Sequence, residues 1–150
     1  MGAMTELPEI PKGWTLGLRT CNDDMTSYEG FKWPTEIGSL VKPDQWIANG
    51  KCGNGLHYLP NGIGDYHYLD FTGKTLIIAA RDCDMIDGDK AKTGEAMVLA
   101  VFDAKTIAPL NADYEAKRDP LYADYDAKRA TLQKTFFAQL CKKAGIGRTQ

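Results

Sequence analysis

The C-terminal part of the chain contains an internal repeat with a period of eleven residues. Leucine, aromatic and alanine residues return at fixed places in it: Leu110, Leu121 and Leu132, then Tyr114, Tyr125 and Phe136, then Ala116, Ala127 and Ala138. Eleven residues fill three helical turns at about 3.67 residues per turn, so the apolar side chains stay on one face of a helix. The repeat therefore predicts an amphipathic helix whose apolar face needs a surface to cover.

Asp119 and Pro120 interrupt this helical pattern. A proline inside a helix costs about 3 kcal/mol, whereas an aspartate cap followed by proline at the first helical position is favourable. We therefore expect either a kink near Pro120 or two helices. The longer one would run from Pro120 to about Lys143, since glycines follow at 145 and 147.

The apolar face of the repeat has two possible partners. Copies of the chain can meet through it, as in a coiled coil, and would then use Leu121, Tyr125, Leu132 and Phe136 to form an oligomer. Alternatively the helix lies on its own sheet, and the same side chains belong to the core. The shortness of the helix favours its own sheet and the regularity of the repeat favours an oligomer, so both alternatives stay open.

The chain before residue 104 has the patterns of β-strands instead. Apolar or alternating runs occur at 14–19, 56–59, 75–80 and 96–102. The stretch 31–41 is also apolar but has a proline at 34 and is followed by another at 43, so we expect a loop and a short strand there. An Asp-Gly turn at 87–88 and a glycine at 94 separate the last two long runs and indicate antiparallel neighbours. We predict an α+β fold with three parts: a tag remnant and extended lead-in at 1–13, a small, mostly antiparallel β-rich module at 14–103, and a helical tail at 104–150.

Composition narrows the class of protein. The 150 residues are 43% hydrophobic and 25% charged, which fits one globular domain with or without an appendage. A net charge of −2 with both signs mixed gives no electrostatic basis for binding nucleic acid. The longest apolar runs are far shorter than a membrane span, and no basic-then-apolar leader opens the chain. The four cysteines are therefore expected to be reduced thiols in a cytoplasm.

The stretch KCGNGLHYLP, residues 51–60, is the least ordinary part of the chain. Cys52 and His57 are weak metal candidates, because zinc sites usually draw ligands from close pairs such as Cys-x-x-Cys, which the chain lacks. A thiolate at Cys52 with His57 as its base is also weakly supported, because nearness in sequence does not place a base at the sulfur. Gly53 and Gly55 instead predict a tight turn with positive φ or close backbone approach. We expect His57 to be a hydrogen-bonded structural residue.

Three segments together resemble ADP-ribosyltransferases in their order. In that family an early strand carries Arg or His, a middle strand follows, and a glutamate opens a late strand. Arg19, His57 and Glu95 occupy these places. The resemblance implies an NAD cleft in which Tyr58, Tyr66 and Tyr68 stack and the carboxylate stabilises a ribosyl cation. The plainer interpretation is a surface arginine, a turn-supporting histidine and a charge at a strand edge.

A second resemblance covers roughly residues 28 to 101. The chain has SYEGFKWPTEIGSLVKP, then CGNGLHYLP, GDYHYL, an Asp-rich turn and GEAMVLAV. This order resembles an uncharacterised domain family of tailed phages and prophages, which has a Trp-Pro-x-x-x-Gly segment and a Cys-Gly-x-Gly-Leu-His core. The family has no activity to transfer and therefore no catalytic residues. The resemblance implies a phage-encoded protein, made in the cytoplasm of the bacterial host and dispensable for virion assembly.

We therefore predict a phage accessory protein that binds a host or phage macromolecule, without catalysis and without a cofactor. The predicted binding residues are the aromatic ones: Trp33, Trp46, Tyr58, Tyr66 and Tyr68. One alternative is a small ADP-ribosyltransferase-like or NAD-binding enzyme that uses Arg19, His57 and Glu95. Another is a minor virion or assembly component that oligomerises through the repeat. The expected partner is a protein, and neither a membrane nor a nucleic acid.

Overall fold

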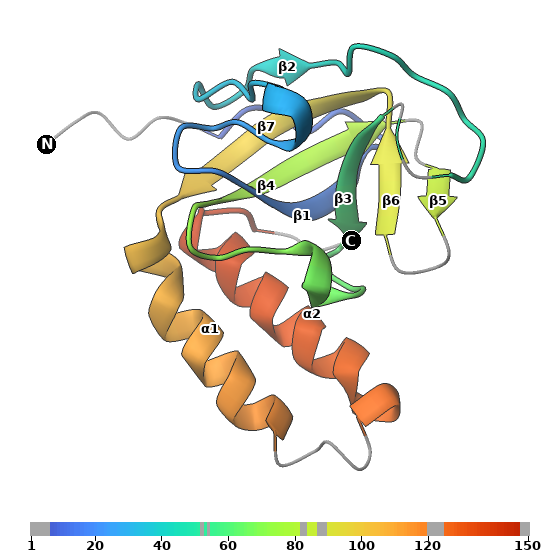
Figure 1. The fold of residues 1–150 in the computed structure, drawn as a ribbon. Coiled ribbons are helices and arrows are strands. Elements are labelled where there is room, and N and C mark those ends of the chain that lie inside the picture. The colour runs from blue at the N-terminus through green and yellow to red at the C-terminus, as the bar shows by residue number, and fades with distance from the viewer. Residues whose placement is uncertain are drawn as a thin grey trace, which may run out of the picture.

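A computed structural model describes residues 7–51, 53, 55–81, 84–86, 90–119 and 125–147. Within these residues the chain forms a seven-stranded sheet followed by two helices (Figure 1). Every strand pair that the structure describes is antiparallel. The predicted α+β fold, with the helical part after the sheet, is confirmed.

The strands lie in the order β2-β7-β4-β1-β3-β6-β5 across the sheet. Their bounds are β1 Thr15–Cys21, β2 Leu40–Val41, β3 Leu56–Pro60, β4 Lys74–Arg81, β5 Asp84–Ile86, β6 Lys90–Thr93 and β7 Glu95–Phe102. The four long runs predicted from the sequence are β1, β3, β4 and β7, and the short predicted strand is β2. The antiparallel pairing predicted for the last two long runs is the β4–β7 pair, which is in register from Arg81–Glu95 to Thr75–Phe102 apart from one bulge.

β4 is an inner strand of the sheet, between β7 and β1, and is covered on both faces. Alternate side chains of a strand point to opposite faces. Ile77 and Ala79 face a core formed with the helices, whereas Leu76, Ile78 and Ala80 face a second core that includes Met25 and Trp33 from the 22–39 segment. This burial on both faces explains why the sequence of β4 is a continuous apolar run rather than an alternating one.

The helical part consists of α1 Ala104–Arg118 and α2 Tyr125–Lys143, which lie together on one side of the sheet (Figure 1). α1 begins after Asp103, whose side chain accepts a hydrogen bond from the backbone N–H of Thr106 at 2.8 Å. Of the two alternatives left open by the sequence, two helices rather than one kinked helix are found. The predicted end at Lys143 is confirmed, and the predicted start at Pro120 lies outside the described residues.

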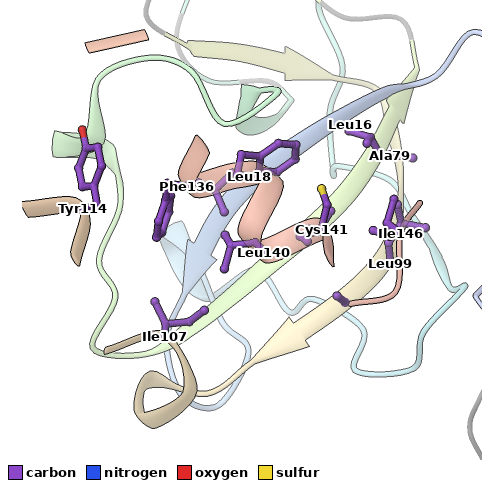
Figure 2. Close-up of a cluster of buried hydrophobic side chains, with 13 residues drawn as sticks. Leu16, Leu18, Ala79, Leu99, Ile107, Tyr114, Phe136, Leu140, Cys141 and Ile146 are labelled. Carbon is purple, nitrogen blue, oxygen red and sulfur yellow. The ribbon is translucent and has the colours of Figure 1, made fainter. Parts of the chain in front are cut away.

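The apolar stripe of the repeat packs on the protein's own sheet. Phe136 is 1% exposed and Tyr114 4% exposed, and Leu110 and Leu132 pack against the same core. Figure 2 shows Phe136 and further α2 side chains beside Leu18 of β1. The expectation that Phe136 lies at an oligomer interface is therefore corrected, because its own chain covers the ring.

The other two residues predicted for an oligomer surface in the first part of the longer helix are Leu121 and Tyr125. Leu121 and the side chain of Tyr125 lie outside the described residues. Oligomerisation through them stays a prediction.

Neither helix is long and apolar enough, over the residues described, to cross a membrane.

Candidate functional site

The candidate site is an opening between β1 and β3. These neighbouring strands pair at Gly17–Pro60 and Leu18–Leu59, where the ladder stops. The same register continued would bring Thr20 opposite His57. Instead the strands separate, and their backbone carbonyls at these positions need other hydrogen-bond donors.

The side chain of Arg19 bridges the opening. Its Nη1 donates to the carbonyl oxygen of His57 at 2.9 Å. Its Nη2 and Nε donate to the carbonyl oxygen of Thr20 at 3.0 and 3.3 Å. The guanidinium also lies over the buried ring of Trp33, 4.3 Å from the ring centroid. The guanidinium thus replaces the missing backbone hydrogen bonds between the two strands. The two carbonyl groups and the aromatic ring fix the orientation of its plane.

Arg19 carries a positive charge that no described acidic side chain pairs with. The side chain is half-buried, and none of the ion pairs among the described residues involves it. Burial lowers the pKa of Arg19 to about 10, and the nearby Cys21 opposes this effect. The guanidinium therefore remains protonated at neutral pH.

The glycines of the 51–60 stretch have the roles predicted for them. Gly53 has a φ of +91°, and a Cβ at Gly55 would lie 3.0 Å from both Lys92 Cδ and Trp46 Cζ3. Gly53 is held from both sides: its N–H donates to His57 Nε2 at 3.0 Å, and its carbonyl accepts from Lys92 Nζ at 2.9 Å. Hydrogen bonds with His57 and Lys92 therefore hold the backbone of this turn at Gly53.

Lys92 also holds this turn, although no sequence pattern predicts a site residue there. It is fully buried on β6, and its ammonium also donates to Asn49 Oδ1 at 2.7 Å. The half-buried ring of Trp46 lies 5.7 Å away, measured from the ammonium to the ring centroid. The only signal in the sequence is the Lys-Ala-Lys alternation at 90–92, which places both lysines on one face of the strand.

His57 is neutral at pH 7. Because Nε2 accepts the Gly53 N–H, the ring proton must be on Nδ1. Burial lowers the pKa of His57 to about 4, helped by the positive charges of Lys90, Arg19 and Lys92. These contacts fit the structural role expected for His57, since its Nε2 lone pair is already used.

A cleft of about 580 Å³ opens beside Arg19, and we call it the Arg19 cleft. Its less exposed lining comes from the strand opening and the turn: Arg19, Gly53, Gly55, Leu56 and His57. Its outer lining comes from two loop segments: Ser27, Tyr28, Glu29 and Phe31, and Pro43, Asp44 and Gln45. Among these, Tyr28, Glu29, Asp44 and Gln45 are exposed. The cleft therefore has a cationic, half-buried floor and a rim with two carboxylates.

Arg19 and His57 are brought together as predicted, but Glu95 is not. Arg19 lies opposite Leu76 on β4, whereas Glu95 lies opposite Arg81 and pairs with it at 3.2 Å. Five residues along a strand separate Leu76 from Arg81, which is about 17 Å. The three residues of the transferase alternative do not form one site.

The predicted aromatic binding residues are distributed over core and surface. Trp33 is 0% and Tyr58 3% exposed, so the expectation that they lie at an exposed binding surface is corrected: both pack in the core under the 22–39 segment. Tyr66 packs against the helix-side core. Tyr68 is exposed, with Lys90 Nζ 4.1 Å from its ring centroid. Tyr28, which was not predicted, is 85% exposed, the highest value among the large apolar residues that the structure describes.

The weak metal candidates gain no support. Cys52 lies outside the described residues, and His57 Nε2 is occupied by the Gly53 N–H. Within the described part of the chain, no three His, Cys, Asp or Glu residues are grouped so that they could hold a metal ion.

Comparison with known proteins gave no significant match to a family model, to a curated protein or to a solved structure.

The protonation of His57 makes stability depend on pH. Its pKa is about 4 in the folded protein and about 6.5 in the unfolded chain, so the unfolded chain binds the extra proton between these values. The free energy of unfolding should therefore fall as pH decreases from 7 to 4.5. We expect this residue to contribute about 2 kcal/mol of that loss, below the full shift because the ring is partly exposed.

The test is urea unfolding of the His57→Gln variant at pH 7 and pH 4.5. Between pH 7 and pH 4.5 this variant should lose about 2 kcal/mol less unfolding free energy than the native protein does. His67→Gln is the matched control, because His67 is the other histidine and is exposed. Equal pH dependence in the two variants would contradict the burial of a neutral His57.

Proposed function

We propose that this protein is a phage-encoded accessory protein that acts by binding a host or phage protein at the Arg19 cleft, without catalysing a reaction. The observation that carries the proposal is the fixed orientation of the arginine at the floor of the cleft. A half-buried guanidinium is held in one plane by the carbonyls of Thr20 and His57 and by the ring of Trp33. A side chain oriented before the partner arrives loses little conformational freedom on binding.

The chemistry around the cleft supports binding more than catalysis. A general base needs a nitrogen free to accept a proton, and His57 Nε2 already accepts the Gly53 N–H. Glu95, the carboxylate of the transferase alternative, is paired with Arg81 at the other end of β4. The groups that remain are suited to recognition: one guanidinium, exposed carboxylates and aromatic side chains.

A protein is the partner class that the surface favours. A net charge of −2 with mixed signs gives no electrostatic basis for binding nucleic acid. Tyr28 is 85% exposed at the rim, and exposed tyrosines are common anchors at protein interfaces. The phage resemblance supports a partner in the cytoplasm of the bacterial host.

Site-specific photo-crosslinking tests this function. A photoreactive amino acid at position 28 should give an adduct of one discrete mass in bacterial lysate, and excess native protein should suppress it. The same amino acid at Lys134, an exposed position of α2, is the control and should not give that adduct. Absence of an adduct at position 28, or the same adducts at both positions, would overturn the proposal.

A further inference from the structure

We propose that the Arg19 cleft recognises a peptide carboxylate flanked by basic side chains, which names the chemistry of the partner and rests on the binding function proposed above. The carboxylate would meet Arg19 at the floor, and the basic groups would meet Glu29 and Asp44 at the rim.

Arg19 keeps donors for such a group. A guanidinium has five N–H groups, and three donate to the carbonyl oxygens of Thr20 and His57. Two N–H groups therefore remain, and the carbonyls that hold the side chain are neutral. A partly buried charge with only neutral acceptors is stabilised by an anion, and the planar guanidinium matches the two oxygens of a carboxylate.

A second positive charge near the floor strengthens its attraction for a carboxylate. Lys92 is buried behind the turn and donates to Gly53 and Asn49, whose oxygens are neutral. Arg19 and Lys92 both act on the neighbouring His57 as positive charges. Since His57 itself is neutral, Arg19 is the one charged group on the described floor of the cleft, and the two carboxylates of the lining lie at its exposed rim.

The rim selects against a ligand that is simply acidic. Glu29 and Asp44 are exposed, line the cleft and take part in none of the ion pairs found among the described residues. They would repel a phosphate or a run of acidic residues and attract lysine or arginine beside the bound carboxylate. A volume of about 580 Å³ suits a short peptide segment.

The probe is the peptide acetyl-Lys-Glu-Lys-amide, titrated into the 15N-labelled protein and followed by NMR. The Arg19 Nε–H and His57 amide signals should shift with saturation. Acetyl-Lys-Gln-Lys-amide should bind at least about tenfold more weakly, because it lacks the charge-assisted pair. The peptide acetyl-Lys-Lys-Gly with a free C-terminus distinguishes a terminal carboxylate from a side-chain one. Equal binding of the Glu and Gln peptides, or tighter binding of inorganic phosphate, would overturn the inference.

Arg19 also bridges β1 and β3, so Arg19→Gln can weaken the fold as well as the binding. The second variant is therefore Glu29→Lys with Asp44→Lys, which changes two exposed side chains. The native protein should prefer acetyl-Lys-Glu-Lys-amide to acetyl-Glu-Glu-Glu-amide, and this variant should reverse that order. It should bind acetyl-Glu-Glu-Glu-amide at least about tenfold more tightly than acetyl-Lys-Glu-Lys-amide. A variant that still prefers acetyl-Lys-Glu-Lys-amide would also overturn the inference. If the position-28 adduct persists while the peptides show no carboxylate preference, only this inference fails, whereas loss of the adduct removes the binding function itself.

Discussion

Replacing Phe136 by alanine is expected to lower the free energy of unfolding by about 3–5 kcal/mol. The ring is 1% exposed and contacts three other aromatic rings, with centroids 5.5 Å from Tyr114, 5.7 Å from Phe71 and 5.9 Å from Tyr66. Removing it leaves a cavity where both helices and the 66–71 segment meet. Globular domains are typically stable by only about 5–15 kcal/mol, so the loss should be evident in urea unfolding followed by circular dichroism.

Lys134→Ala is the control for this change. Lys134 is exposed on the same helix, and its replacement should alter the free energy of unfolding by less than about 0.5 kcal/mol. Sedimentation of each variant measures its mass. A Phe136→Ala variant of nearly native stability but lower mass would mean that the ring lies between copies of the chain, contrary to the structure.

The location of Phe136 illustrates what a periodic pattern predicts. The eleven-residue repeat predicted correctly that Leu132 and Phe136 share a helix face with each other, because that depends only on the helix period. What the face covers depends on side chains distant in sequence, such as Leu18 and Ile77. The repeat therefore supported a coiled coil and a helix-on-sheet arrangement about equally.

Strands were predicted where their own residues are apolar. β4 and β7 are continuous apolar runs, and both were found in the sequence. The β5–β6 hairpin was predicted only as a turn, because β6 reads Lys-Ala-Lys-Thr and has no apolar pattern. Lys92 is buried because its ammonium finds Asn49 and Gly53, which are 43 and 39 residues away in sequence. No local signal contains those partners.

The same reasoning explains the mixed result at the candidate site. Gly53 and Gly55 were predicted as turn glycines, since positive φ and close approach are properties of single positions. Arg19 and His57 were grouped by the order of segments, and the opening between β1 and β3 does bring them together. Glu95 was grouped by the same order, but the β4–β7 register places it at the opposite end of the sheet.

Replacing Gly17 by alanine is expected to destabilise the protein by about 1–3 kcal/mol, although alanine suits a strand better than glycine does. A Cβ at this position would lie 2.2 Å from Cδ2 of the buried Tyr58 ring. Gly17 is one of the two β1 residues that pair with β3, beside the opening that Arg19 fills. The clash should therefore loosen the strand pairing that positions the Arg19 cleft.

A double-mutant cycle with Tyr58→Leu isolates this contact. In the Tyr58→Leu background, Gly17→Ala should be nearly neutral, since the ring is gone and alanine reduces the freedom of the unfolded chain. The coupling between the two sites should be about 1–3 kcal/mol, measured by urea unfolding. Gly147→Ala, where a Cβ meets nothing within 4 Å, controls for the general effect of adding a methyl group. An equal loss from Gly17→Ala in both backgrounds would show that the ring of Tyr58 does not lie over Gly17, and the opening of the sheet would then need another cause.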